Sequence, residues 1–242
     1  MPVTHGKLVQ AGSAHKQEDS TFLSHHSRRD AIRVVRGLTP EPIWRLYDAM
    51  RVLAALGALF LRLSGWRVEG KLPVWASRAV VIAAPHTTNW DLPYMLAVSW
   101  VLGIRPCWLG KRELFAAPFG WLMRWLGGIP VDRSRRANLV EEAAMRLREA
   151  EHLFLVVPPS GTRSRAPHWK SGFYHIARAA RVPIVCAFLD YERKVGGIGP
   201  VLVPSGDIGA DMDRLRVFYR EIRGKYPERE TPVRLSEEDA AA

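Results

Sequence analysis

The stretch Ala79-Val-Val-Ile-Ala-Ala84, followed by Pro85-His-Thr-Thr-Asn-Trp-Asp91, decides how this chain folds. Six apolar residues in a row lack the alternation of a half-exposed strand, so they predict a strand that is buried on both faces. Two further runs of this kind, Leu153–Val157 and Val182–Leu189, predict two more buried strands.

Segments with helical spacing of apolar residues separate these runs. Helices are expected over residues 92–102, 137–151, 173–181 and 212–225, and a short strand over 106–109. Alternating strands and helices with continuously apolar strands predict an α/β fold. We expect a single domain at residues 67–226, with a mixed, largely parallel sheet flanked by helices.

The N-terminal part of the chain predicts a helix of a different kind. Thr39-Pro40-Glu41 is a helix-start signal, and the following residues keep their charges on one side. Residues 39–66 therefore predict an amphipathic helix, which either lies in a membrane interface or packs against the sheet. Residues 1–38 are expected to be a disordered tail, and residues 227–242 a frayed one.

The composition restricts the class of protein. The 242 residues include 35 Lys and Arg against 24 Asp and Glu, a formal charge of +11, which favours an anionic partner such as a membrane surface or a phosphorylated substrate. No nucleic-acid motif is present, so nucleic acid is not expected as a partner.

The cellular compartment is predicted from three features that the sequence lacks: a disulfide framework, a membrane-spanning segment and a signal peptide. Two cysteines, Cys107 and Cys186, cannot build a disulfide framework. The chain also lacks an apolar run of about 20 residues and the apolar core of a signal peptide. We therefore expect a peripheral protein on the cytoplasmic side of the cell membrane.

His86 and Asp91 are the leading candidates for chemistry. A carboxylate five residues after a histidine can accept the imidazole N–H and leave the other ring nitrogen as a proton acceptor. His25 and Asp30 repeat the spacing, but in the polar tail and without a strand to position them. A structural histidine is the alternative at position 86.

A basic loop follows the run Leu153–Val157. Gly161 permits a close backbone approach, and Thr162 and Arg163 offer donors that suit a phosphate. Residues 152–189 contain no acidic side chain. A solvated basic face is the other interpretation of such a run.

The segment Leu114–Leu126 is rich in aromatic residues. It predicts either an acyl groove or a membrane-facing surface, with an ordinary buried helix as the alternative.

Four blocks of sequence together resemble those of the glycerolipid acyltransferases, which include the lysophosphatidic acid acyltransferases. In chain order they read HTTNWD, with the family's His-X4-Asp spacing, KRELFAAPFG…GGIPVDR, PSGTRSR and VPIVCAFLD, and they cover roughly residues 75–205. The resemblance implies transfer of an acyl group from acyl-CoA or an acyl-carrier protein to a lipid hydroxyl. It implies no metal and no cofactor beyond that donor.

The same resemblance assigns roles to residues. His86 would be the general base and Asp91 its orienting partner. The acceptor's polar head would be held by five residues of the second and third blocks: Lys111, Arg133, Gly161, Thr162 and Arg163. The third block usually reads Glu-Gly-Thr-Arg, but here Ser160 stands in place of the glutamate, which leaves the identity of the acceptor open.

Two other functions remain open at this point. One is a non-enzymatic basic protein that binds anionic membrane or nucleic acid. The other is a serine hydrolase with Ser160 as nucleophile, although the glycine that a nucleophile elbow has two positions earlier is replaced by Pro158.

Overall fold

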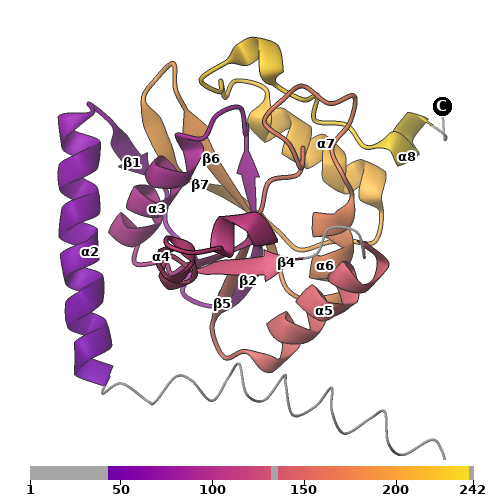
Figure 1. Cartoon of the computed structure of the whole chain (residues 1–242). Coiled ribbons are helices and arrows are strands. Elements are labelled where there is room, and N and C mark those ends of the chain that lie inside the picture. The colour runs from indigo at the N-terminus through magenta and orange to yellow at the C-terminus, as the bar shows by residue number, and fades with distance from the viewer. Residues whose placement is uncertain (1–42, 132–135, 240–242) are drawn as a thin grey trace, which may run out of the picture. The chain divides into compact units, whose positions relative to one another are not determined.

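A seven-stranded sheet forms the centre of the structure, a computed structural model that describes residues 43–131 and 136–239. Figure 1 shows its strands fanning across the molecule. The strands are β1 (Arg67–Glu69), β2 (Arg78–Ala84), β3 (Pro106–Lys111), β4 (Gly128–Val131), β5 (Leu153–Val157), β6 (Ile184–Asp190) and β7 (Val195–Leu202). Their order in the sheet is β1-β7-β6-β2-β5-β3-β4.

The five strands from β6 to β4 run parallel, and β7 pairs with β6 in the antiparallel direction. The predicted mixed, largely parallel sheet is confirmed. Because β6, β2, β5, β3 and β4 share one direction, their carboxyl ends meet at the same edge. Open α/β sheets place their ligand sites at such an edge.

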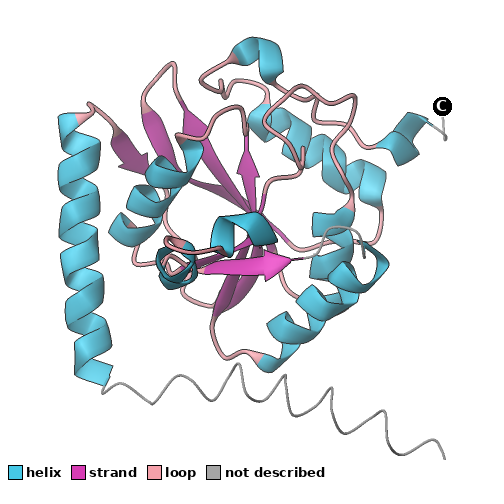
Figure 2. Ribbon diagram, in the orientation of Figure 1, coloured by secondary structure: helices cyan, strands magenta, loops and turns pink. Residues whose placement is uncertain are grey.

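Helices cover both faces of the sheet, as Figure 2 shows. They are α2 (Ile43–Leu63), α3 (Asp91–Val101), α4 (Gly120–Trp125), α5 (Arg136–Glu149), α6 (Gly172–Ala180), α7 (Ile208–Tyr219) and α8 (Ser236–Asp239), with the 3-10 turns η1 (Arg112–Phe115) and η2 (Pro227–Arg229). The two faces of strand β2 pack against two different layers of helices. Val80 and Ile82 face a core built with α5, α6 and α7, whereas Ala79 and Val81 face α3 and η1.

Contacts group residues from Tyr47 onward into one unit. Within this unit, α2 packs through Leu61 and Phe60 against Ala97, Val98 and neighbouring side chains. The core-packing interpretation of this helix is therefore confirmed for one of its faces. A second face, described below, stays exposed. In the part of the chain that the structure describes, no helix has the length and apolar character that crossing a membrane requires.

The C-terminal part differs from the sequence-based expectation. The prediction of a frayed segment after Pro227 is wrong for residues 227–239, because Leu235 is completely buried and forms a bridge with Trp169. Helix α7 begins earlier than predicted, since the side chain of Asp207 accepts a hydrogen bond from the Ala210 amide and caps it. The predicted tail at 1–38 lies outside the described residues.

Candidate active site

His86 and Asp91 lie where the carboxyl end of β2 meets the start of α3. His86 Nδ1 and Asp91 Oδ2 are 2.8 Å apart. The same oxygen accepts the backbone N–H groups of Thr87 at 3.0 Å and Thr88 at 3.1 Å. Asp91 is the first residue of α3, where the helix dipole stabilises a negative charge. The loop, the helix and the imidazole together therefore fix this carboxylate.

The contact with Asp91 determines which ring nitrogen of His86 carries the hydrogen. An ionised carboxylate only accepts hydrogen bonds, so the hydrogen is assigned to His86 Nδ1, and Nε2 presents a lone pair. The His86 side chain is 23 % exposed, whereas that of Asp91 is 8 % exposed. The arrangement can hold an imidazole in one tautomer and leave its second nitrogen open to an incoming proton donor.

Tyr191 completes the surroundings of Asp91, and the sequence analysis missed it. Its hydroxyl donates to Asp91 Oδ1 at 2.8 Å. Its ring packs against Trp66 and Tyr94, with centroids 4.9 and 5.8 Å away. Burial and the charge of Asp91 raise the pKa of the Tyr191 phenol, which therefore stays protonated and donates. One signal was available: Tyr191 directly follows β6, the strand beside β2.

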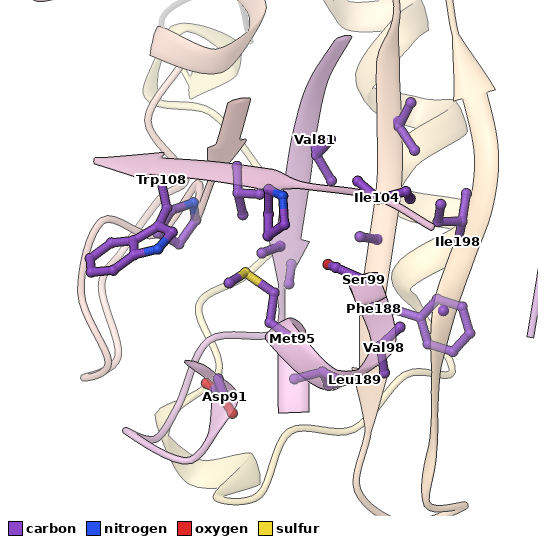
Figure 3. A pocket seen from close by; sticks show the side chains of 18 of the residues that line it. Val81, Asp91, Met95, Val98, Ser99, Ile104, Trp108, Phe188, Leu189 and Ile198 are labelled. Carbon is purple, nitrogen blue, oxygen red and sulfur yellow. The ribbon is translucent and has the colours of Figure 1, made fainter. Parts of the chain in front are cut away.

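An apolar cavity of about 140 Å³ extends from this pair between α3 and the sheet (Figure 3). The figure shows Met95 and Ser99 of α3 on one side, and Val81 and Trp108 of the strands on the other. His86 and Asp91 line it as well, and almost all of its other lining residues are apolar. A hydrocarbon chain can enter this cavity with its end group beside the imidazole.

A second, smaller cavity lies on another side of His86. Its volume is about 40 Å³, and Ser160, Glu230 and Thr231 contribute polar side chains to its lining. The hydroxyl of Ser160 donates to the Thr162 carbonyl at 2.8 Å. Apolar residues such as Ile222 and Val233 line it too, but its polar side chains distinguish it from the first, and we call it the polar cavity. His86 is thus common to both cavities.

The predicted anion-binding residues follow the carboxyl ends of neighbouring strands. Lys111 ends β3 and is exposed. Gly161, Thr162 and Arg163 lie in the loop after β5, and Arg163 is exposed. Arg133 lies outside the described residues.

The loop after β5 has a definite local structure. Gly161 has φ +66°, and a Cβ there would lie 2.7 Å from Lys170 Nζ, so a larger residue would be strained and would displace this cation. The Thr162 hydroxyl accepts the Ser164 amide within the loop at 3.2 Å. The structure brings the loop to the polar cavity through Ser160, whereas Lys111 and Arg163 are placed only at the same sheet edge.

The aromatic segment at 114–126 is not a buried helix. Phe115 is buried against Trp108, but Phe119, Trp121 and Trp125 around α4 are each more than half exposed. The alternative of an ordinary core helix is therefore wrong for α4. Among the residues that the structure describes, no three His, Cys, Asp or Glu side chains gather into a potential metal site.

Known proteins resemble this chain in sequence and in fold. A model of the family described as Acyltransferase matches residues 65–189, just over half of the chain. The 1-acyl-sn-glycerol-3-phosphate acyltransferase of Haemophilus influenzae is 33% identical over 133 residues, which cover 51% of this chain and 53% of that protein. The enzyme of the same name from Streptococcus pneumoniae is 30% identical over 109 residues, 43% of this chain and 39% of that protein.

The chain thus spans about half or less of the length of these two curated relatives. The crystal structure of the 1-acyl-sn-glycerophosphate (LPA) acyltransferase PlsC from Thermotoga maritima has a TM-score of 0.54 and 20% identity, covering 81% of this chain and 85% of that one, which shows a common fold. The match to the family model contains His86, Asp91 and the loop at Gly161. The chain belongs to the Acyltransferase family.

Proposed function

We propose that this protein transfers a fatty acyl group from a thioester, acyl-CoA or acyl-carrier protein, to a hydroxyl of a lysophospholipid or glycerol-phosphate-type lipid. One observation carries the proposal: His86 is held through Nδ1 by Asp91 and borders both an apolar and a polar cavity. The names of the two curated relatives agree with this reaction.

In the proposed mechanism His86 is the general base. The acceptor hydroxyl gives its proton to His86 Nε2 while its oxygen attacks the thioester carbonyl carbon. The carbon–sulfur bond then breaks, and the leaving thiolate takes the proton from the imidazolium. Asp91 stabilises that imidazolium and keeps the ring in one orientation. No covalent acyl-enzyme is needed.

The two cavities suggest how the substrates lie. The fatty chain of the donor occupies the apolar cavity beneath α3, because burial of its methylenes there is favourable. The head of the acceptor lies on the polar side. Its phosphate is held by Lys111, Gly161, Thr162 and Arg163, which end or follow strands at the same sheet edge. Arg133, outside the described residues, is proposed for the same role from the sequence.

The experiment that tests this function is a transfer assay. Purified protein is incubated with acyl-CoA or acyl-carrier protein and a panel of lysolipids with and without phosphate, and the products are identified by mass spectrometry. We expect an acylated lipid, and a loss of about 100-fold or more in the His86→Ala variant. His152→Ala, at the opposite end of β5, is the matched control. Full activity in a folded His86→Ala protein would refute the mechanism.

Ser160→Ala separates this function from a serine hydrolase. The Ser160 hydroxyl donates to a carbonyl of its own turn, which is a structural role. We therefore expect this variant to keep most of the transfer activity, whereas a serine hydrolase would lose nearly all of its hydrolytic activity.

We also propose that the protein binds the membrane surface through α2. Val52, Leu56, Leu59 and Leu63 repeat at helical spacing and are each more than half exposed. Such a stripe can insert into the interfacial region, and the net charge of +11 favours anionic lipid. Replacing Leu56 and Leu63 with Glu should weaken binding to anionic vesicles about 10-fold or more. Unchanged co-sedimentation would remove α2 from this role.

A further inference from the structure

The polar cavity beside His86 contains one feature that the proposed reaction does not use. Among the described residues that line it, Glu230 alone carries a carboxylate, and Ser160 and Thr231 lie with it. The volume of about 40 Å³ exceeds the 10–15 Å³ or so that a single water needs, so a small polar group fits inside. Glu230 and His86 both line this one cavity.

Glu230 is held in place by its backbone and one of its oxygens. Its amide donates to the Pro227 carbonyl at 3.0 Å. Its Oε1 accepts the Gly224 amide at 2.6 Å. A carboxylate has two oxygens and room for about four hydrogen bonds, so Glu230 has further capacity to accept.

The segment around Glu230 is fixed against the loop that follows β5. The Ala166 amide donates to the Thr231 hydroxyl at 3.0 Å, and the Trp169 amide to the Arg234 carbonyl at 2.8 Å. The bridge between Trp169 and the fully buried Leu235 extends this contact. The position of Glu230 beside the cavity is therefore built into the fold.

The loop after β5 cannot supply a carboxylate itself. Residues 152–189 contain no Asp or Glu, and the short side chain of Ser160 uses its hydroxyl on the Thr162 carbonyl. A carboxylate also repels a phosphate, so the anionic end of an acceptor is kept out of this cavity. What the cavity can take beside Glu230 is a hydrogen-bond donor.

We propose that Glu230 selects the acceptor by accepting a hydrogen bond from a second hydroxyl, next to the one that reacts. This inference rests on the proposed function and names its substrate class: a glycerol-phosphate-type acceptor with two neighbouring hydroxyl groups. The reacting hydroxyl donates to His86 Nε2, and the neighbouring hydroxyl donates to the Glu230 carboxylate. A site built to bind a hydroxyl discriminates strongly against an analogue that lacks it, because the acceptor in the site then loses one of its hydrogen bonds.

The test compares three acceptors with the whole protein: glycerol 3-phosphate, propane-1,3-diol monophosphate, which lacks only the neighbouring hydroxyl, and 1-acylglycerol 3-phosphate, which has a single hydroxyl. We expect the wild-type kcat/KM for glycerol 3-phosphate to exceed that for the propanediol phosphate about 10-fold or more. In Glu230→Gln this preference should disappear.

The glutamine variant separates recognition from folding. Its amide oxygen can still accept the Gly224 N–H, which turns the NH₂ group, a donor, toward the cavity. A merely structural change would lower activity on both phosphates equally and keep their ratio. Glu228→Gln, on the same exposed turn beside Arg229, is the matched control and should leave the ratio unchanged.

Each result decides the question. A ratio near one in the wild type, an unchanged ratio in Glu230→Gln, or a wild-type preference for 1-acylglycerol 3-phosphate would overturn the role of Glu230 while the proposed acyl transfer stands. Absence of transfer to any of the three acceptors and to the lysolipid panel would overturn both.

Discussion

The two cavities that meet at His86 differ in size, lining and origin. The apolar one, about 140 Å³, is lined by α3 and the strands of the sheet, with residues between Leu72 and Ile198. The polar one, about 40 Å³, needs the loop after β5 and residues 230–233 from the far end of the chain. The difference indicates that α3 and the sheet provide room for a hydrocarbon chain. Selection of a polar head depends instead on the loop after β5 and on residues 230–233. Four substitutions test this division.

The largest effect is expected at the boundary between the cavities. Asp91→Asn should lower kcat about 100-fold or more, because an amide that donates to Nδ1 reverses the tautomer of His86 and removes the partner of its cation. Steady-state kinetics with a donor and acceptor that the wild type uses measure the change.

Asp211→Asn is the matched control for this variant. Asp211 is also a buried carboxylate that accepts from a tyrosine hydroxyl, at 2.9 Å from Tyr174, but it is not among the residues that line the two cavities. It should lower stability and leave kcat of the folded protein within a few-fold. Equal loss of kcat in both variants would show that Asp91 acts through folding alone.

On the polar side, Arg163→Ala should raise the KM of a phosphate-bearing acceptor about 10-fold with little change in the KM of the donor. A guanidinium contributes to binding of the phosphate in ground state and transition state alike. Arg105→Ala is the control, because this exposed residue precedes β3 and so lies at the opposite edge of the sheet. An unchanged KM for the acceptor would remove Arg163 from this role.

How much the sequence predicts depends on whether a residue acts within its own segment. Strand β5 was predicted to the residue, and His86 with Asp91 was found because both lie in one loop. Strand β7 was missed, since three of its residues are glycines, which weaken strand propensity. Gly197 is required by packing: a Cβ there would lie 1.9 Å from the Glu69 carbonyl oxygen of β1.

The two residues near His86 that the sequence analysis missed, Tyr191 and Glu230, were missed for one reason. Tyr191 contacts Asp91 across 100 positions of sequence. Glu230 lies in a segment whose charged, proline-containing composition resembles a tail, although its backbone pairs with the loop at Trp169. Local periodicity carries no information about such pairings, which depend on how strands order themselves in the sheet.

On the apolar side, Ser99→Leu should narrow the cavity beneath α3. We expect kcat/KM to fall about five- to ten-fold for a long-chain donor and to change little for a short-chain one, because added methylenes occupy the space of the chain. Val101→Leu, an exposed position on the same helix, is the control. Equal loss for both chain lengths would show a general packing defect instead.

The smallest effect is expected for Tyr191→Phe, which removes one of the donors to Asp91 while the ring still packs on Trp66. The loss in kcat should be about three-fold, since Asp91 keeps its hydrogen bonds to His86 and two backbone amides. Tyr94→Phe, in the same ring cluster, is the control and should leave kcat unchanged.

The difference in stability between the wild type and Tyr191→Phe depends on pH in a direction that the pKa of the phenol fixes. The folded state raises the pKa of the Tyr191 phenol above its ordinary value of about 10. The phenol's contribution is therefore complete below pH 10 and is lost as the pH rises above it. Wild type and Tyr191→Phe should differ in free energy of unfolding by a constant amount between pH 6 and about 9, and the two should converge above pH 10. A difference that grows with pH would contradict the hydrogen bond to Asp91, because only a phenol that keeps its proton can donate to Asp91 Oδ1.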